Sequence, residues 1–268
     1  MSDDSPKYRD CGEGIFGSAA DDPAPTQEDD MLPYSLQLLS DALPKVEIPT
    51  ERFDPNGEWE HNYAIWIPSR GKDFKSEPAG SLRIRRRLTP DGNIRLVVTQ
   101  IVRMKDVNGS GRSKAAITCV NDKLCAPIRW QIDSEVDNPD GKQVRLTSVS
   151  ISGEASGGSI TLDGKKITAS ERLSSSWSLF DAVQRLPFDA KELRFDMLEE
   201  MELLKPDQML WAGETAEMEI GGRKTRLHSF EQIGWGILPF TYWIDDNHRL
   251  IVAVSQRRAY LLGSASSK

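Results

Sequence analysis

The sequence predicts a mainly β protein, built on one large curved antiparallel sheet or open barrel with two or three short helices. From residue 58 onwards, polar and apolar side chains alternate with a period of two, as in strands with one buried face. Turn-forming pairs such as Asp91-Gly92 and Asp163-Gly164 recur between these segments, which is typical of hairpins. Neither a fixed-length repeat nor a linker interrupts them, so residues 31–265 are expected to form a single β-rich domain.

The composition supports a folded core and excludes some classes of function. Of 268 residues, 38% are hydrophobic and 7% aromatic, which suffices for a core. The net charge of −7 argues against nucleic-acid binding. No apolar run reaches the roughly 20 residues of a transmembrane helix, so the chain is not expected to span a membrane. Local spacings typical of metal ligands or of cofactor fingerprints are absent, so neither a metal nor a cofactor is predicted.

The first 30 residues differ from the rest of the chain. They are rich in Asp, Pro, Ser and Gly and poor in aliphatic residues, which predicts a mobile acidic arm over residues 1–30. The arm contains neither the basic nor the apolar region of a signal peptide. Two localisations follow: a cytoplasmic protein, or a periplasmic or otherwise extracytoplasmic protein whose targeting segment has been removed.

Two helices are expected among the strands. Leucines at helical spacing predict a short amphipathic helix over Leu32–Leu43. A second helix is expected over Trp177–Leu186, after serines that can cap it and before Pro187. The segment Lys191–Lys205 fits a helix or a strand, and a strand is favoured because Lys205–Gln208 then acts as a turn. Strands are expected over residues 58–67, 81–88, 94–104, 128–132, 144–152, 160–162 and 224–230.

The last hairpin, Gln232–Tyr260, carries two tryptophans, a tyrosine and a phenylalanine before its turn. Strongly apolar residues flank Asp245-Asp246-Asn247, which predicts its turn. Trp235, Trp243 and Tyr242 are candidate ligand-binding residues, because exposed aromatic rings stack on sugars or line a lipid-accepting cup. The alternative is that these rings fill the core. Trp235 is the strongest candidate because Gly234 and Gly236 leave room beside its ring.

Two cysteines and a row of arginines are further candidates. Cys119 and Cys125 flank a five-residue turn, which predicts either a disulfide across a hairpin or two reduced, half-buried thiols. Arg83, Arg85 and Arg87 lie on one face of a strand, where they either bind an acidic ligand or pair with acids on a solvated face.

Catalytic residues are harder to select. His228 together with Glu231 and Tyr242 is a weak candidate for a general acid–base group. Complete nucleophile, phosphate-loop or dinucleotide motifs are absent from the sequence. Whether the protein is an enzyme therefore stays open, and a binding function is favoured.

The C-terminal third resembles exported bacterial families of unknown function. The residues that carry the resemblance are Phe195–Leu198, Leu204–Gln208, Gly234–Pro239 and Tyr242–Asp245. Such families are similar to the curved-sheet, half-barrel LolA/LolB lipoprotein carriers. The resemblance implies a curved sheet and export, and it assigns no catalytic residue.

Three functions follow as hypotheses. The first is an extracytoplasmic binding or carrier module, which holds an apolar or glycan-like ligand in the cup of the sheet. The second is a carbohydrate-active enzyme, a polysaccharide lyase or glycoside hydrolase that acts on an acidic sugar. The third is a structural envelope protein without a small ligand, which is envelope-associated and does not cross the membrane.

Overall fold

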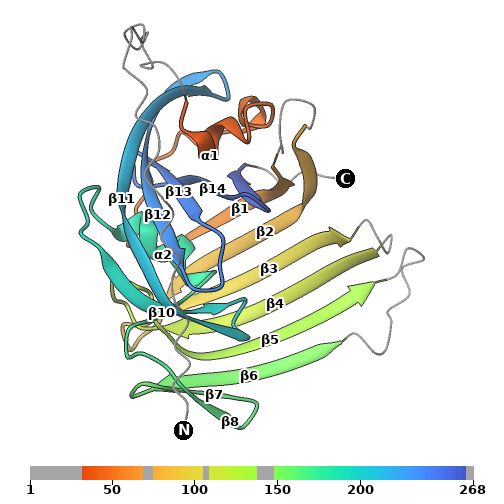
Figure 1. Ribbon diagram of the computed structural model, residues 1–268, viewed down its shortest axis with the longest axis vertical. Coiled ribbons are helices and arrows are strands. Elements are labelled where there is room, and N and C mark those ends of the chain that lie inside the picture. Colours follow the sequence, from red (N-terminus) through yellow and green to blue (C-terminus); the bar gives the residue numbers. More distant parts are fainter. Residues whose placement is uncertain (1–31, 69–74, 105–108, 138–147, 264–268) are drawn as a thin grey trace, which may run out of the picture. The chain divides into compact units, whose positions relative to one another are not determined.

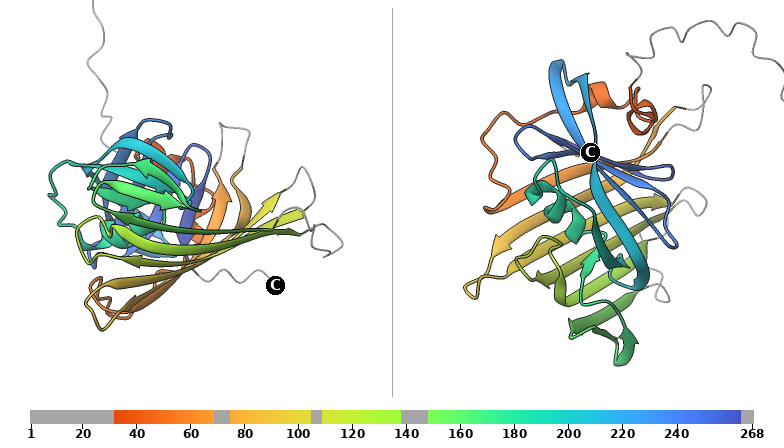
Figure 2. Two further views of the ribbon diagram at one scale, coloured as in Figure 1. Left: turned by 90° about the horizontal axis from the view of Figure 1, so that it is seen from below. Right: turned by 60° about the vertical axis from the view of Figure 1, so that its left-hand side comes forward.

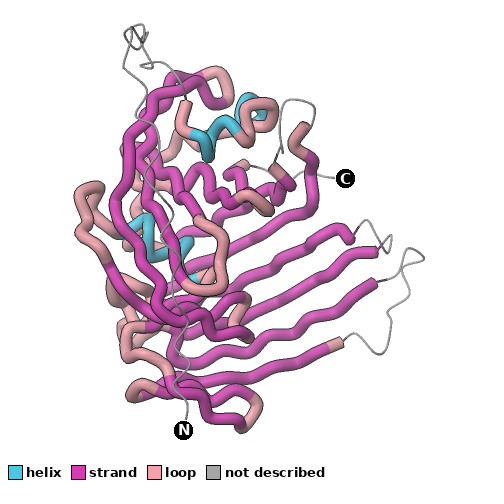
Figure 3. Tube along the Cα trace, viewed as in Figure 1, coloured by secondary structure: helices cyan, strands magenta, loops and turns pink. Residues whose placement is uncertain are grey.

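A computed structural model describes residues 32–68, 75–104, 109–137 and 148–263. They belong to one compact unit, Leu32–Lys268. The described residues form one 15-stranded sheet, and Figure 1 shows its long strands running side by side. Figure 3 shows how little of these residues is helical, and no helix among them is long and apolar enough to cross a bilayer. The predicted fold class, a large antiparallel sheet with few short helices, is confirmed.

The strands follow one another almost in chain order. The sheet order is β8-β7-β6-β5-β4-β3-β2-β1-β15-β14-β13-β12-β11-β10-β9, and the pairs are antiparallel except β9 with β10. The bounds are β1 Trp59–Ile67, β2 Glu77–Leu88, β3 Ile94–Met104, β4 Gly109–Cys119, β5 Pro127–Asp137, β6 Val149–Ser156, β7 Ser159–Leu162, β8 Lys165–Thr168, β9 Leu173–Ser175, β10 Leu193–Glu199, β11 Leu203–Ile220, β12 Arg223–Gly234, β13 Phe240–Asp245, β14 Leu250–Ser255 and β15 Ala259–Leu262.

Most of the predicted turns lie where the sequence places them. Asp91-Gly92 joins β2 to β3, Asp163-Gly164 joins β7 to β8, and Asp245–Asn247 joins β13 to β14. Glycines with positive φ occupy several of these turns, for example Gly92 at 81° and Gly164 at 80°. The predicted turn at residues 138–141 and the start of the strand predicted over 144–152 lie outside the described residues.

The C-terminal strands lie over one face of the N-terminal strands, as Figure 2 shows with teal and blue above yellow and green. Helix α2, Ser178–Arg185, packs on that face, which we call the inner face. Its polar side chains reach several strands: Asp181 binds Arg86 of β2, Gln184 contacts His61 of β1, and Ser178 contacts Cys119 of β4. Because seven of its eight residues are buried, α2 acts as a plug between the two halves of the sheet.

The N-terminal segment covers the opposite, outer face of the C-terminal strands. Leu36, Leu39 and Leu43 are buried, as the helical spacing predicts. The helix itself is much shorter than predicted: α1 spans only Tyr34–Gln37, and the 3₁₀ turn η1 follows at Leu43–Lys45. The chain leaves the helix at Leu38 and continues in turns, and the Leu38 carbonyl accepts a hydrogen bond from the Ser76 hydroxyl at 3.0 Å.

The ambiguous segment Lys191–Lys205 is mostly strand, which confirms the favoured alternative. The turn predicted at Lys205–Gln208 is wrong, because those residues lie inside β11 and form a bulge around Asp207, which has a φ of 51°. The chain turns earlier, at Glu200 and Met201, where the Glu202 amide donates to the Glu199 carbonyl at 3.1 Å.

The predicted disulfide is not formed, because Cys119 and Cys125 are both free and buried. Cys119 ends β4 and pairs with Pro127, so the cysteines do not oppose each other in the ladder. Cys125 lies in the turn itself, with a φ of 50°. Burial raises the pKa of its thiol, and the neighbouring Cys119 thiol raises it further. The structure therefore has the second predicted arrangement, two reduced thiols, in a more deeply buried form.

Candidate functional site

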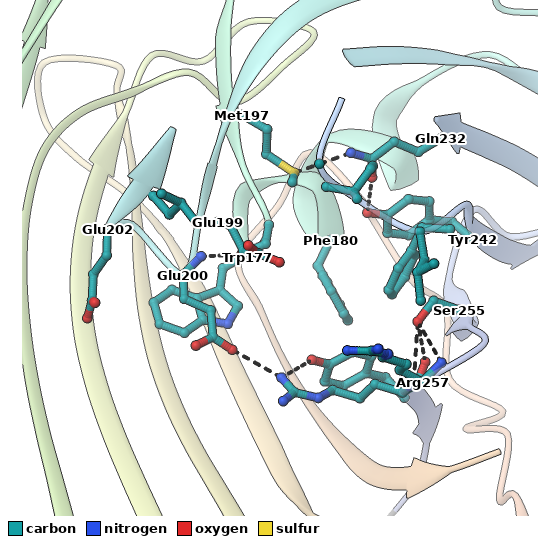
Figure 4. A pocket seen from close by; sticks show the side chains of 18 residues that line it. Trp177, Phe180, Met197, Glu199, Glu200, Glu202, Gln232, Tyr242, Ser255 and Arg257 are labelled. Atoms are coloured by element: carbon teal, nitrogen blue, oxygen red, sulfur yellow. Dashed lines mark hydrogen bonds and ion pairs between the residues drawn. The ribbon is translucent and has the colours of Figure 1, made fainter. Parts of the chain in front are cut away.

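A hollow with mainly apolar walls lies between α2, the β10–β11 hairpin and the strands β12 to β15. We call it the aromatic cavity; its volume is about 530 Å³. Figure 4 shows its side chains, with Phe180 between Trp177 and Tyr242. Its apolar lining consists of Trp177, Phe180, Met197, Leu203, Ile237, Leu238, Phe240, Tyr242 and Tyr260. Cavities of 300–1,000 Å³ with mainly apolar walls are typical of small-molecule sites.

Phe180 of α2 is the centre of the aromatic wall. Its ring meets Tyr242 of β13 and Tyr260 of β15 edge to face, with centroids 6.2 and 5.2 Å apart. Phe240 packs on Tyr242 at 4.9 Å, so strand alternation puts both rings on the inner face. Edge-to-face packing at these distances stabilises aromatic clusters. The wall is therefore set by the fold and does not require a ligand.

The polar groups at the inner end of the cavity are engaged with one another. The Tyr242 hydroxyl donates to Gln232 Oε1 at 2.9 Å, and Gln232 Nε2 points at the Met197 sulfur at 3.2 Å. Burial raises the pKa of Tyr242, and the neighbouring Tyr260 raises it further. A tyrosine so strongly held in its neutral form is unsuited to act as a base.

Charged residues gather at the mouth of the cavity. Arg258 Nη1 and Gln100 Nε2 both donate to Glu200 Oε1, at 3.0 and 3.2 Å. Arg257 lines the cavity beside them, and among the described residues it forms no ion pair. Burial raises the pKa of the Glu202 carboxyl, and Glu200 adds to this effect. The mouth thus combines two guanidinium groups with three acids, of which Glu199 and Glu200 form ion pairs.

The tip of the β10–β11 hairpin is strained. Glu200 and Met201 have φ angles of 47° and 64°, the left-handed region that glycine and asparagine favour. The conformation costs an L-residue about 1–2 kcal/mol. The Met201 side chain is fully buried, and the Ser176 hydroxyl accepts the Glu200 amide at 2.9 Å. These contacts hold a backbone that the sequence alone disfavours, and such strain is common at functional sites.

The structure brings only one of the predicted aromatic ligand residues to the cavity. Tyr242 lines it. Trp243 faces the other side of β13, fully buried, and its indole donates to Ser35 at 3.1 Å, so it is a core residue. Trp235 has 74% of its surface exposed and lies outside the cavity lining, although Gly236 immediately after it belongs to that lining.

The predicted arginine row lies on the outer face of β2 and is already paired. Arg85 binds Glu60 of β1, Arg87 binds Glu58 just before β1, and Arg83 donates to Asn62 at 3.0 Å. This arrangement corresponds to the solvated, ion-paired alternative. The row lies on the face opposite α2, away from the aromatic cavity.

The weak catalytic candidates do not converge. Tyr242 and His228 lie on the inner face, whereas Glu231 points to the outer face of β12, where Thr241 donates to it at 2.9 Å. The ring of His228 is stacked on Phe188 at 3.9 Å and bonded to Asp246 at 2.8 Å. A catalytic group of these three residues is therefore not assembled. No His, Cys, Asp or Glu cluster suited to a metal occurs among the described residues.

A second hollow, of about 730 Å³, lies where the segment Glu47–Asp54 passes β1. Arg249 is buried there, donating to the carbonyls of Pro49 and Glu51 at 2.6 and 2.8 Å. Burial and then the charge of Arg249 lower the pKa of His61 to about 4. Five acidic side chains line this hollow, and Arg249 already binds the segment Glu47–Asp54. We therefore assign a structural role to this hollow and to Arg249.

Comparison with known proteins supports the fold. No protein-family model and no curated protein matches the sequence significantly. A solved structure with a similar fold is a beta-barrel-like protein of a domain of unknown function, DUF1849, from Brucella abortus. The match has a TM-score of 0.50 and 6% identity, and it covers 77% of this chain and 95% of that chain. At this identity it shows the fold alone; a curved, barrel-like sheet fits, and the specific resemblance to LolA/LolB carriers is not confirmed.

Several cavity residues gave no signal in the sequence. Glu200 and Arg258 are 58 positions apart in the chain and meet only in the folded protein, where the turn after β10 lies beside the turn before β15. Gln100 of β3 also contacts Glu200, although it lies 100 positions before Glu200 in the chain. Phe180 was part of the predicted helix, but its role depends on which strands that helix packs against. A surplus of aromatic residues in the C-terminal hairpin was the available hint.

Proposed function

We propose that this protein is a non-catalytic binding protein, which holds a small apolar or amphipathic molecule in the aromatic cavity. The wall of that cavity carries the proposal, because Phe180, Phe240, Tyr242 and Tyr260 form a preformed apolar surface beside a volume of about 530 Å³. Apolar surface contributes about 25 cal/mol per Å² when a ligand covers it. Apolar side chains at the mouth, such as Leu203 and Leu238, give a ligand a continuous path inwards.

The chemistry of the wall favours an apolar ligand over a glycan. A sugar requires many hydrogen-bonding partners, since unpaired buried polar groups are costly. The inner polar groups, Tyr242 and Gln232, already satisfy each other. The alternative of a carbohydrate-active enzyme is not favoured either, because His228 and Glu231 lie on different faces of β12.

Filling the cavity tests the proposal. Leu238→Trp places an indole at the mouth, and Val97→Trp on the outer face of β3 is a matched control, because both side chains are 39% exposed. Each protein is titrated with a neutral naphthylamine dye whose fluorescence rises in apolar surroundings. We expect saturable binding by the wild type and by Val97→Trp, and at least tenfold weaker binding by Leu238→Trp.

Two outcomes would overturn the proposal. One is equal dye affinity of Leu238→Trp and the wild type, which would place the dye elsewhere. The other is the absence of saturable binding by the wild type, both of the dye and of lipid extracts scored by native mass spectrometry. That second result would favour a structural protein without a small ligand.

A further inference from the structure

The Glu200 carboxylate occupies a cradle at the mouth of the aromatic cavity. Its Oε1 atom accepts two bonds, from Arg258 Nη1 at 3.0 Å and from Gln100 Nε2 at 3.2 Å. The same Nη1 atom lies 3.4 Å from the Tyr260 hydroxyl. A guanidinium and a side-chain amide that converge on one oxygen form a site for a carboxylate, with charge-assisted hydrogen bonds.

The three side chains of this cradle differ in exposure: Gln100 is buried, whereas Arg258 and Glu200 are 38% and 47% exposed. Gln100 is buried on the inner face of β3, and Arg258 lies in the turn between β14 and β15, beside the buried Tyr260. Glu200 sits at the strained hairpin tip. Since Met201 and Ser176 anchor the tip backbone, a rotation of the Glu200 side chain alone would free the cradle and place its carboxylate in water.

The mouth offers an anionic ligand a second guanidinium group besides Arg258. Arg257 adjoins Arg258 in the cavity lining, and within the described residues it has no ion-pair partner. Of the other acids at the mouth, Glu199 is paired with Lys205 at 3.4 Å, and the pKa of Glu202 is raised by burial and then by Glu200. A ligand carboxylate that replaces Glu200 leaves the charge of the cradle unchanged, whereas a neutral head group that displaced Glu200 would leave Arg258 without a charged acceptor.

Resting on the function proposed above, we propose that the ligand is an apolar monocarboxylate, whose carboxylate displaces Glu200 from Arg258 and Gln100 while its apolar part fills the aromatic cavity. Glu200 then acts as an internal competitor, which closes the cradle when no ligand is bound. A fatty acid or an arylalkanoic acid has this chemistry.

The competitor is tested with a matched pair of ligands. The wild type and Glu200→Gln are titrated, by calorimetry, with a medium-chain fatty acid and with the primary alcohol of the same chain length. A neutral amide competes less well for a guanidinium, so we expect Glu200→Gln to bind the acid at least fivefold more tightly and the alcohol with unchanged affinity. Glu217→Gln is the control, because Glu217 is similarly exposed (43%) and paired with Lys224, away from the cavity.

The cradle is tested with Arg258→Gln. We expect this variant to lose the preference for the acid over the alcohol while it retains binding of the alcohol. Thermal unfolding of each variant checks that the hairpin stays folded. Equal gains in Glu200→Gln and Glu217→Gln, or equal gains for acid and alcohol, would overturn the inference and leave the proposed function standing. If the wild type bound neither ligand nor the neutral dye, the proposed function would fail first.

Discussion

Neighbouring arginines on the two faces of strand β2 form ion pairs that differ in their burial. Arg86 points to the inner face, fully buried, and binds Asp181 of the plug at 2.6 Å and the Asn56 carbonyl at 2.7 Å. Arg85 and Arg87, its neighbours in the chain, point to the outer face and form solvent-exposed ion pairs with Glu60 of β1 and with Glu58 just before it. Strand alternation alone separates a structural ion pair from a solvated one.

This difference in burial determines which ion pairs contribute strongly to the stability of the folded protein. A buried ion pair loses the hydration of both groups, so removal of one partner leaves an uncompensated charge and costs about 3–5 kcal/mol. An exposed pair contributes about 0–1 kcal/mol, because water and salt screen it. The inner face is therefore expected to govern folding, while the outer face, where the sequence shows its most conspicuous arginine row, tolerates change.

Asp181→Ala should have the largest effect. Asp181 binds both Arg86 and Arg185 inside the plug, at 2.6 and 2.7 Å, so its loss leaves two buried guanidinium groups without their carboxylate. We expect the free energy of unfolding to fall by about 3–5 kcal/mol in urea titrations. Glu192→Ala, which removes the exposed partner of Arg194, is the control and should change it by less than about 1 kcal/mol. Equal losses would show that the inner face is not special.

His61 should make the inner face sensitive to acid. The pKa of His61 in the folded protein is about 4, below the usual 6.5. Between pH 6.5 and pH 4, His61 is therefore protonated in the unfolded chain and neutral in the folded chain. Stability from this residue is complete above pH 6.5 and falls as the pH decreases towards 4, by up to about 3 kcal/mol. Urea titrations from pH 7 to 4 should show a shallower decline for His61→Asn than for the wild type. Parallel declines would assign the acid sensitivity to other groups.

The sequence was informative where structure is local. Asp91-Gly92 marks a turn because Gly92 accepts a positive φ, and Asp245–Asn247 marks one because the Asp245 carboxylate accepts the amides of Asn247 and Arg249. Alternation separates Arg86 from Arg85 and Arg87. The turn at Glu200 and Met201 escaped prediction because neither residue type favours a positive φ; distant contacts hold it. The aromatic cavity could not be predicted from the sequence for the same reason, since its walls come from elements that are distant in the chain: α2, β10, β13 and β15.

The smallest expected effect belongs to the outer face. Arg87 Nη1 lies 2.8 Å from Glu58 Oε2, and both side chains are about half exposed. In a double-mutant cycle of Arg87→Ala and Glu58→Ala, we expect a coupling free energy below about 1 kcal/mol in low salt. It should decrease further in 1 M salt, where the Debye length shrinks to about 3 Å. A coupling as large as the loss in Asp181→Ala would mean that the outer pair is shielded from water, and burial could then no longer explain why α2 and the inner face dominate stability.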